Sequence, residues 1–138
     1  MRFVIIVSTM ILVLSSCEKD SGEGGTSEIS GNVYKIFTFQ NPITGEFDTS
    51  YFQLDSEKDV FIIYSDNQSD IYDDKFETDY NGRYHFEYLR YGNYTIYTYA
   101  DSTDISNIKY EYPVFRSVKI NSRNSSIKVE DFIIEENQ

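Results

Sequence analysis

Short apolar runs separated by turn residues fill the chain from Glu28 to its end. Residues 83–88 alternate most cleanly, with an aromatic side chain at every second position and polar side chains between them. Residues 59–64 are apolar on both faces, which is typical of a central strand. No segment has the apolar period of a helix. The pattern predicts an all-β fold, with strands at residues 29–39, 47–54, 59–64, 75–78, 83–88, 94–100, 114–120 and 127–134.

Turn signals connect these runs. Asn81-Gly82 is the strongest hairpin signal, since both central residues of a type I′ turn need a positive φ. Gly92 permits a bend before the next strand. A chain of 138 residues has room for one core beside a targeting segment. We therefore predict a single small antiparallel β-sandwich of about seven strands over residues 28–138.

The first residues have the layout of an export signal. Arg2 supplies a positive charge, and residues 3–14 form an apolar run. At about 1.5 Å per residue this run makes roughly 18 Å of helix, which is too short for the ~30 Å hydrocarbon core. Leu14-Ser15-Ser16 then leads into Cys17, which resembles the bacterial lipobox. We expect residues 1–16 to be removed and Cys17 to be lipidated; the alternative is an ordinary signal with an incidental cysteine.

Residues 17–27 are rich in glycine, serine and charge, and we expect them to form a flexible tether. Glu18-Lys19-Asp20 resembles the signals that send lipoproteins of Bacteroidetes-type bacteria to the outer face of the outer membrane. The resemblance implies a protein anchored to the outer membrane and exposed at the cell surface. Acylation by several chains would make that anchor stable.

Composition narrows the partners. The chain has 13 Tyr, 10 Phe and a single alanine, which suits strands. Its formal net charge of −11 and lack of a basic stripe argue against binding to nucleic acid. Cys17 is the only cysteine, so no disulfide can form within the chain.

The middle of the chain resembles a known class of domain. The matching segments are GNV at residues 31–33, VFIIY at 60–64, TDYNGRYHF at 78–86 and LRYGNYTI at 89–96. They are similar to prealbumin-like sandwiches, namely carboxypeptidase regulatory-like domains and the B-type repeats of collagen-binding surface proteins. The resemblance implies a stalk, spacer or binding module. Some B-type repeats join a lysine to an asparagine beside a buried acid. Lys35 and Asn137 are placed for such a bond, but residues 94–99 hold no acid, so we favour a surface lysine.

An acidic segment at residues 66–79 is a candidate Ca²⁺ site. It contains six acids and one lysine. As an EF-hand loop it would need a glycine at its sixth position, where Ile71 stands, so an EF-hand is rejected. A looser Ca²⁺ site and a solvated acidic loop both stay open. The metal candidates are Asp66, Asp70, Asp73 and Asp74.

Tyrosines offer a second candidate site. Tyr94 and Ile96 should share one face of their strand, which places Tyr97 and Tyr99 on the other. Tyrosine combines rigid apolar area with a polar tip, so Tyr97 and Tyr99 could form a face that binds glycan or protein. The alternative is that both sets are buried.

Catalysis finds little support in the residues. His85 is the only histidine, and it shares a strand face with Glu87. No nucleophile elbow, phosphate-binding loop or zinc-ligand cluster accompanies the pair, so we expect His85 to face solvent. The favoured function is a non-enzymatic envelope lipoprotein whose sandwich is an interaction or scaffold module. The alternative is a surface protein that binds glycan or Ca²⁺, and an enzyme of unrecognised type ranks last.

Overall fold

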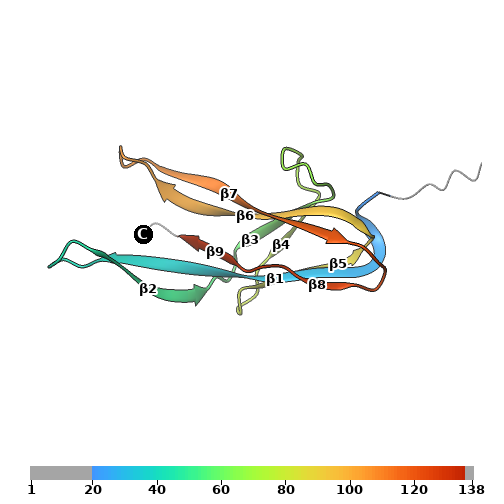
Figure 1. Cartoon of the computed structure of the whole chain (residues 1–138), viewed down its shortest axis with the longest axis horizontal. Helices are drawn as coiled ribbons and strands as arrows, with labels where there is room; N and C mark the ends of the chain where they lie inside the picture. The colour runs from blue at the N-terminus through green and yellow to red at the C-terminus, as the bar shows by residue number, and fades with distance from the viewer. Residues whose placement is uncertain (1–19, 136–138) are drawn as a thin grey trace, which may run out of the picture.

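The structure is a computed structural model that describes residues 20–135, and it confirms the all-β sandwich. The strands form two sheets packed face to face (Figure 1). The first sheet contains β1 (Glu23–Gln40), β2 (Phe47–Leu54), β5 (Arg83–Leu89), β8 (Ser126–Lys128) and β9 (Phe132–Glu135). The second has the order β4-β3-β6-β7, with β3 at Asp59–Ile63, β4 at Asp74–Glu77, β6 at Gly92–Thr103 and β7 at Lys109–Ile120.

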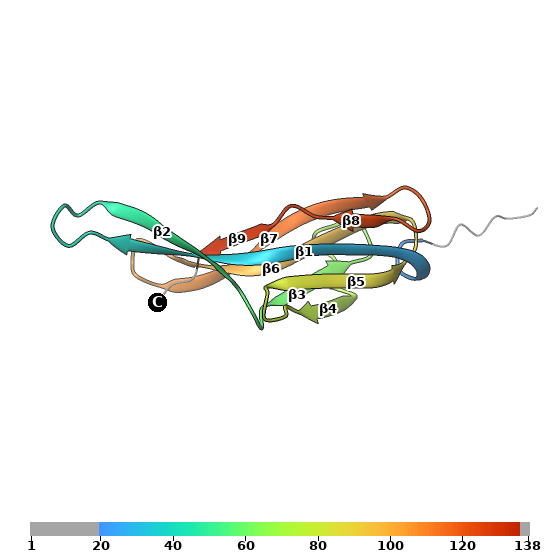
Figure 2. The ribbon, with the colours of Figure 1, turned by 90° about the horizontal axis from the view of Figure 1, so that it is seen from below.

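The long strand β1 organises the first sheet (Figure 2). Its first half pairs antiparallel with β5 and parallel with β8, and its second half pairs antiparallel with β2 and parallel with β9. The single strand predicted at residues 127–134 is therefore two strands. The break is fixed where the Val129 amide donates to the Ser30 carbonyl over 2.8 Å.

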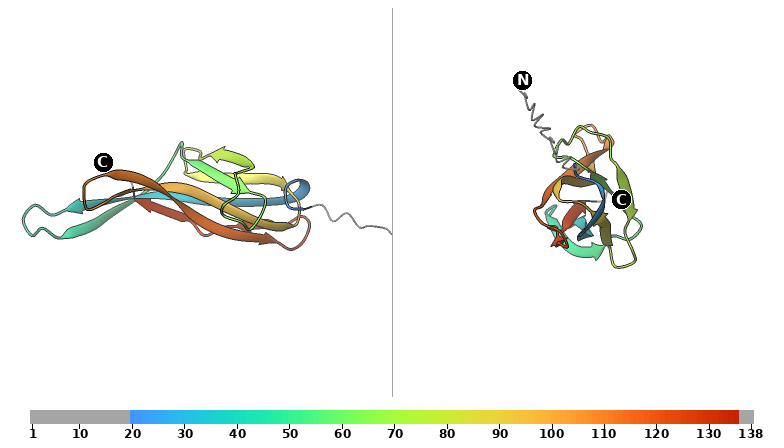
Figure 3. Two further views of the ribbon diagram at one scale, coloured as in Figure 1. Left: turned by 90° about the horizontal axis from the view of Figure 1, so that it is seen from above. Right: turned by 90° about the vertical axis from the view of Figure 1, so that its right-hand side faces the viewer.

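The hairpin of β6 and β7 is longer than predicted. Its register runs without a break from Gly92 opposite Ile120 to Thr103 opposite Lys109. The strands predicted at residues 94–100 and 114–120 are therefore too short, because only residues 104–108 connect β6 and β7. This hairpin and that of β1 and β2 both extend past the other strands at one end of the molecule, whereas residue 20 lies at the opposite end (Figure 3).

The core lies between the two sheets and is built by alternation. Each fully buried aliphatic or aromatic side chain contributes about 1.5–3 kcal/mol relative to exposure. The largest such side chains are Tyr84, Tyr94, Phe132, Ile29, Ile62, Ile63, Leu89 and Ile96. Alternation along β5 fails at Tyr88, which we expected beside Tyr84 and Phe86: it is 70% exposed, and its φ of 58° turns Leu89 inward in its place.

The turn before β5 also differs from the prediction. Gly82 has a φ of 65°, but Asn81 does not have a positive φ, so the turn is not type I′. Asp79 organises it instead, because its carboxylate accepts the amides of Asn81 and Arg83 at 2.8 and 3.0 Å. A Cβ at Gly82 would lie 2.7 Å from the Val33 carbonyl oxygen, which explains the glycine.

The expected tether is folded over much of its length. β1 begins at Glu23, and Ser27 is only 2% exposed. The Gly22 amide donates to the Tyr94 hydroxyl at 2.9 Å, and Arg90 donates to the Asp20 carbonyl at 2.8 Å. The prediction of a flexible tether over residues 17–27 is thus wrong from residue 20 onward, because partners more than sixty residues away hold the glycine-rich segment. The predicted signal and Cys17 lie outside the described residues. Among residues 20–135 there is no helix able to cross a membrane.

Candidate functional site

The outer face of the second sheet carries a row of aromatic side chains. Alternation along β6 sends Tyr94 and Ile96 into the core, and Tyr97 and Tyr99 to the outer face. The register places Phe61 of β3 and Phe115 of β7 on either side of Tyr97. Three neighbouring strands therefore each contribute one ring to a row that crosses the sheet.

The rings are in close contact. Phe61 and Tyr97 stack with centroids 4.9 Å apart and an interplanar angle of 17°, and Phe115 lies 5.2 Å beyond Tyr97. Tyr99 meets Phe61 and Tyr97 edge-on at 5.8 and 5.7 Å. Tyr72 reaches over from the loop after β3 to lie 4.9 Å from Phe61. We call these five rings the outer aromatic cluster: Phe61, Tyr72, Tyr97, Tyr99 and Phe115.

The outer aromatic cluster is shielded mainly by its own members. Tyr97 in the centre is only 8% exposed, whereas Tyr72 at the margin is 46% exposed and the other three rings are half-buried. The first sheet packs on the opposite face of this sheet. The prediction that Tyr97 and Tyr99 lie on one face, away from Tyr94 and Ile96, is confirmed.

A hollow of about 390 Å³ opens beside the cluster. Phe61 and Tyr99 form its apolar wall. Asp59 forms part of the polar wall: its Oδ2 atom lies 3.1 Å from Lys75 Nζ, but its buried Oδ1 atom has no hydrogen-bond partner among the described residues. The Asp59 side chain as a whole is 41% exposed, so its carboxylate can accept a hydrogen bond from a hydroxyl or amine in the hollow. The remaining lining residues are Glu57, Lys58 and Glu111.

Tyr97 keeps its proton in this setting. Burial raises the pKa of its hydroxyl, because it removes solvent from the phenolate, and the neighbouring Tyr99 hydroxyl raises the pKa further. Tyr97 therefore contributes a neutral hydroxyl to the centre of the cluster.

The four aspartates proposed as metal ligands do not form a metal-binding group. Asp70 accepts hydrogen bonds from Ser65 and Asn67 at 2.6 Å each, and Asp73 accepts the Tyr64 amide at 2.6 Å. Asp74 accepts the amide of Lys75 at 2.7 Å, and Asp66 is exposed. Within residues 20–135 no three side chains of His, Cys, Asp or Glu converge on one point. These acids shape the loop, and Ca²⁺ binding there stays a prediction that melting curves with added Ca²⁺ would test.

The other sequence candidates lie apart. His85 faces solvent, as expected, with its Nε2 atom 3.8 Å from Glu87 and its side chain 52% exposed. Lys35 is not the expected surface lysine: its Nζ atom lies 2.7 Å from Asp55, whose side chain is 4% exposed. Asn137 lies outside the described residues. Gly82 and Gly92 both adopt positive φ, at 65° and 143°, where the chain turns.

The sequence predicted Tyr97 and Tyr99, but not the phenylalanines and acids of this site. Phe61 and Phe115 come from strands far from Tyr97 in the chain, and only the sheet order brings them together. Asp59 and Glu111 were missed for the same reason. One feature of the sequence could have indicated Phe61: its strand is apolar on both faces, so an aromatic ring had to lie on the outer face.

No protein-family model matches the chain, and no curated protein matches it. A solved structure from Pseudomonas aeruginosa, described as a "putative carbohydrate binding protein", aligns with 84% of this chain and 92% of its own. The identity is 14% and the TM-score 0.44. What the outer aromatic cluster can bind is therefore argued from its own residues.

Proposed function

We propose that this protein is a non-enzymatic lipoprotein of the bacterial cell envelope whose sandwich binds a neutral glycan at the outer aromatic cluster. The observation that carries the proposal is the row of rings Phe61, Tyr97 and Phe115 beside a hollow lined by carboxylates. Cleavage before Cys17 and acylation of its thiol would anchor the domain to the outer membrane. The resemblance of residues 18–20 to an export signal favours the outer face.

The chemistry of the cluster suits a sugar ring. A pyranose has one face of C–H groups that packs against an aromatic ring, and hydroxyl groups around its edge that need hydrogen-bond partners. Phe61 and Tyr99 offer the apolar wall of the hollow. The half-exposed carboxylate of Asp59 offers a hydrogen-bond acceptor in the polar wall. The two requirements are met side by side.

The charge of the hollow narrows the sugar class. Its lining holds the three acids Glu57, Asp59 and Glu111, and one lysine, Lys58. Uronic acids and sulfated sugars would place further negative charge among those carboxylates, which is unfavourable at short range. A neutral glycan avoids this repulsion and still uses the acceptors.

We also propose a more specific fold class for the sandwich. Two antiparallel-dominated sheets in one domain support a prealbumin-like sandwich of the carboxypeptidase regulatory-like type. Such domains act as binding modules or spacers in larger systems, in agreement with a role that needs no catalytic group.

Electrophoresis in gels containing a soluble polysaccharide tests glycan binding. We expect laminarin, mannan or xyloglucan to retard the protein, and polygalacturonate not to. The Tyr99→Ala variant should lose the retardation, whereas Tyr110→Ala, another exposed aromatic on the same hairpin, should keep it. Equal mobility in all gels would contradict glycan binding.

Lipidation has a test of its own. Mass spectrometry of the mature N-terminal peptide should show acyl chains on Cys17. A Cys17→Ser variant should not be retained in the membrane fraction as a processed protein.

A protein partner at the hairpin ends is a second candidate. Ile43 in the β1–β2 turn and Ile105 in the β6–β7 turn are essentially fully exposed, at 92% and 107%. Ile108, beside the same turn as Ile105, is 61% exposed as well, and apolar side chains gathered at one end of a domain suit insertion into an apolar recess of a neighbouring envelope protein. A photo-crosslinking residue at position 105 should capture that neighbour in cells, and the same residue at Asp101, in the half-buried stem of the same hairpin, serves as the control.

A further inference from the structure

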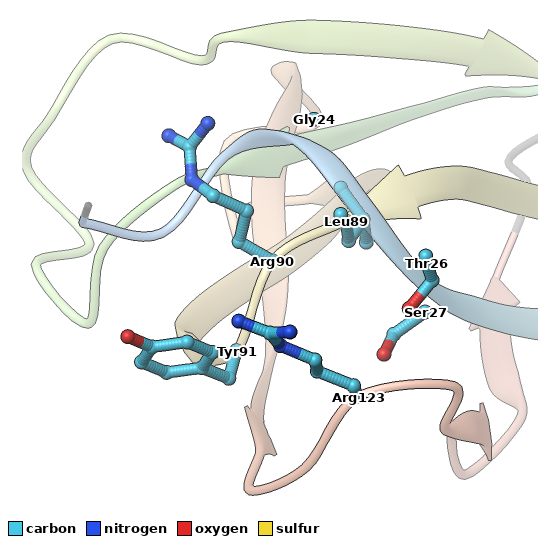
Figure 4. A pocket seen from close by; sticks show the side chains of 8 residues that line it. Gly24, Thr26, Ser27, Leu89, Arg90, Tyr91 and Arg123 are labelled. Atoms are coloured by element: carbon cyan, nitrogen blue, oxygen red, sulfur yellow. The ribbon is translucent and has the colours of Figure 1, made fainter. Parts of the chain in front are cut away.

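A second cleft, of about 410 Å³, lies at the end of the molecule remote from the hairpin tips (Figure 4). It opens between the start of β1 and the loop that joins β7 to β8, which holds Arg123. We call it the Arg123 cleft. Its lining residues are Gly24, Gly25, Thr26, Ser27, Leu89, Arg90, Tyr91 and Arg123.

The Arg123 cleft is preformed by the glycine-rich segment. Glu23 and Ser27 both lie opposite Leu89, so the residues between them bulge out of the ladder. A Cβ on Gly25 would overlap the Leu89 carbonyl. The loop is fastened to the bulge, because the amides of Asn124 and Ser125 donate to the hydroxyls of Thr26 and Ser27 at 3.1 and 3.0 Å.

The charge of the Arg123 cleft is opposite to that of the molecule. None of its eight lining residues is acidic, although the chain carries a net charge of −11. Arg90 directs its guanidinium to the backbone carbonyls of Asp20, Ser21 and Glu23, and it forms no ion pair with a described carboxylate. Arg123 reaches across the opening towards Tyr91, with no hydrogen bond or ion pair to any of residues 20–135 (Figure 4).

From this geometry we infer that the Arg123 cleft binds a phosphate group. A guanidinium without a carboxylate partner matches the geometry of phosphate oxygens, and the second positive charge of Arg90 adds to the local potential. Lys35, Lys75 and Arg116 each lie against a carboxylate, so these two arginines differ from them.

The position of the cleft points to a lipid headgroup as the source, and this step rests on the proposed lipidation. Residue 20 is already held by Arg90, so only residues 18 and 19 separate the folded end from Cys17. Three Cα–Cα steps span at most about 11 Å. An acylated Cys17 would therefore keep the Arg123 cleft at the membrane surface, where lipid phosphates lie, and direct the two hairpins away from it.

The test uses the acylated full chain, purified from membranes into dodecyl maltoside micelles that contain no phosphate. The chain has no tryptophan, so a Tyr91→Trp substitution gives one fluorescent reporter in the cleft. It is titrated with inorganic phosphate, and separately with dihexanoyl phosphatidic acid, at constant ionic strength. We expect saturation with the lipid at concentrations at least tenfold below those needed for inorganic phosphate.

Two variants of the reporter protein make the result specific. Arg123→Gln should weaken both titrations at least tenfold and leave the melting temperature without ligand unchanged, since Arg123 has no partner to lose. Arg83→Gln, the same charge change at the opposite end of β5, should leave both titrations unchanged. Equal affinity for the two ligands would support the phosphate site and assign it to soluble phosphate.

No saturation with either ligand, or saturation unaffected by Arg123→Gln, would overturn the inference. Absence of acyl chains from Cys17 by mass spectrometry would contradict the anchoring alone. The phosphate titration reports on the cleft in either case.

Discussion

The two faces of β6 show how similar residues serve folding and binding. Tyr94 on the inner face is 0% exposed and Tyr97 on the outer face is 8% exposed, so burial alone barely separates them. The two tyrosines differ instead in the residues that pack against them. Tyr94 packs between the two sheets, and its hydroxyl donates to the Arg90 carbonyl at 2.6 Å and accepts the Gly22 amide. Tyr97 is enclosed by rings of its own sheet.

The difference teaches that a ring at the centre of an aromatic row can be buried without a second layer. Inner residues such as Tyr94 fasten one sheet to the other and also hold the glycine-rich start of the chain. Outer residues such as Tyr99 have neighbours only beside them, which leaves ring area beside the hollow. The inner face should therefore govern stability and the outer face ligand binding.

The largest expected effect is that of Tyr94→Ala. Removing a fully buried aromatic ring between the sheets should lower the free energy of unfolding by about 3–5 kcal/mol. Urea denaturation measures it. Asn93→Ala, an exposed neighbour on the same strand, should stay within about 0.5 kcal/mol of the wild type.

Tyr97→Ala should have a smaller effect on stability. The ring loses contacts with Phe61 and Phe115 but leaves no cavity between the sheets, so we expect a loss of about 1–3 kcal/mol. The same urea titration measures this change. If Tyr97→Ala is as destabilising as Tyr94→Ala, the distinction between the two faces is wrong.

Tyr99→Ala should separate binding from stability. Its half-buried ring contributes about 0.5–1.5 kcal/mol through edge-on contacts. Binding of the neutral glycan, measured by calorimetry, should weaken at least tenfold. Tyr99→Phe should retain most of the binding, because the ring supplies the apolar wall, whereas an unchanged affinity in Tyr99→Ala would place the ligand elsewhere.

The smallest effect at neutral pH is expected for Tyr84→Phe. The Tyr84 hydroxyl is buried without a hydrogen-bond partner among the described residues, so removing it should leave stability equal or slightly higher. Burial raises the pKa of Tyr84, the nearby charge of Asp131 raises it further, and Arg116 opposes both.

That pKa shift predicts a dependence on alkaline pH. The folded state keeps a proton that the unfolded chain releases near pH ~10. The stabilising contribution of Tyr84 is therefore complete below about pH 10 and is lost as the pH rises through the folded-state pKa. Denaturation midpoints measured up to pH 11 should fall less steeply in Tyr84→Phe than in the wild type. A parallel decline in both proteins would show that the Tyr84 hydroxyl is not the source.

Local patterns were enough to predict most strands, because alternation and turn residues act within a few positions. Residues 47–54 and the outward pair Tyr97 and Tyr99 were predicted correctly on that basis. The ordered start of β1 was not predicted, because Gly22 and Gly24 are held by contacts with Tyr94 and Arg90, which lie far away in the sequence. The bulge at Tyr88 is likewise a consequence of packing Leu89 inward.

The candidate site could be predicted only in part. Sequence assigns Tyr97 and Tyr99 to one face, but it does not say that β3 and β7 flank β6. The row of Phe61 and Phe115, and the approach of Asp59 and Glu111 to the hollow, are products of sheet order. Likewise, the buried partner of Lys35 proved to be Asp55, which follows β2 directly.

Saturation-transfer NMR with neutral hexasaccharides of glucose, mannose and xylose tests the central claim most directly. Irradiation of the tyrosine and phenylalanine ring protons should transfer saturation to the C–H protons of one face of a bound sugar. The transfer should disappear in Phe61→Ala and Tyr99→Ala and persist in Tyr110→Ala. Transfer that is equally strong in all three variants, or absent from every sugar in the wild type, would contradict the assignment of the outer aromatic cluster as a glycan-binding face.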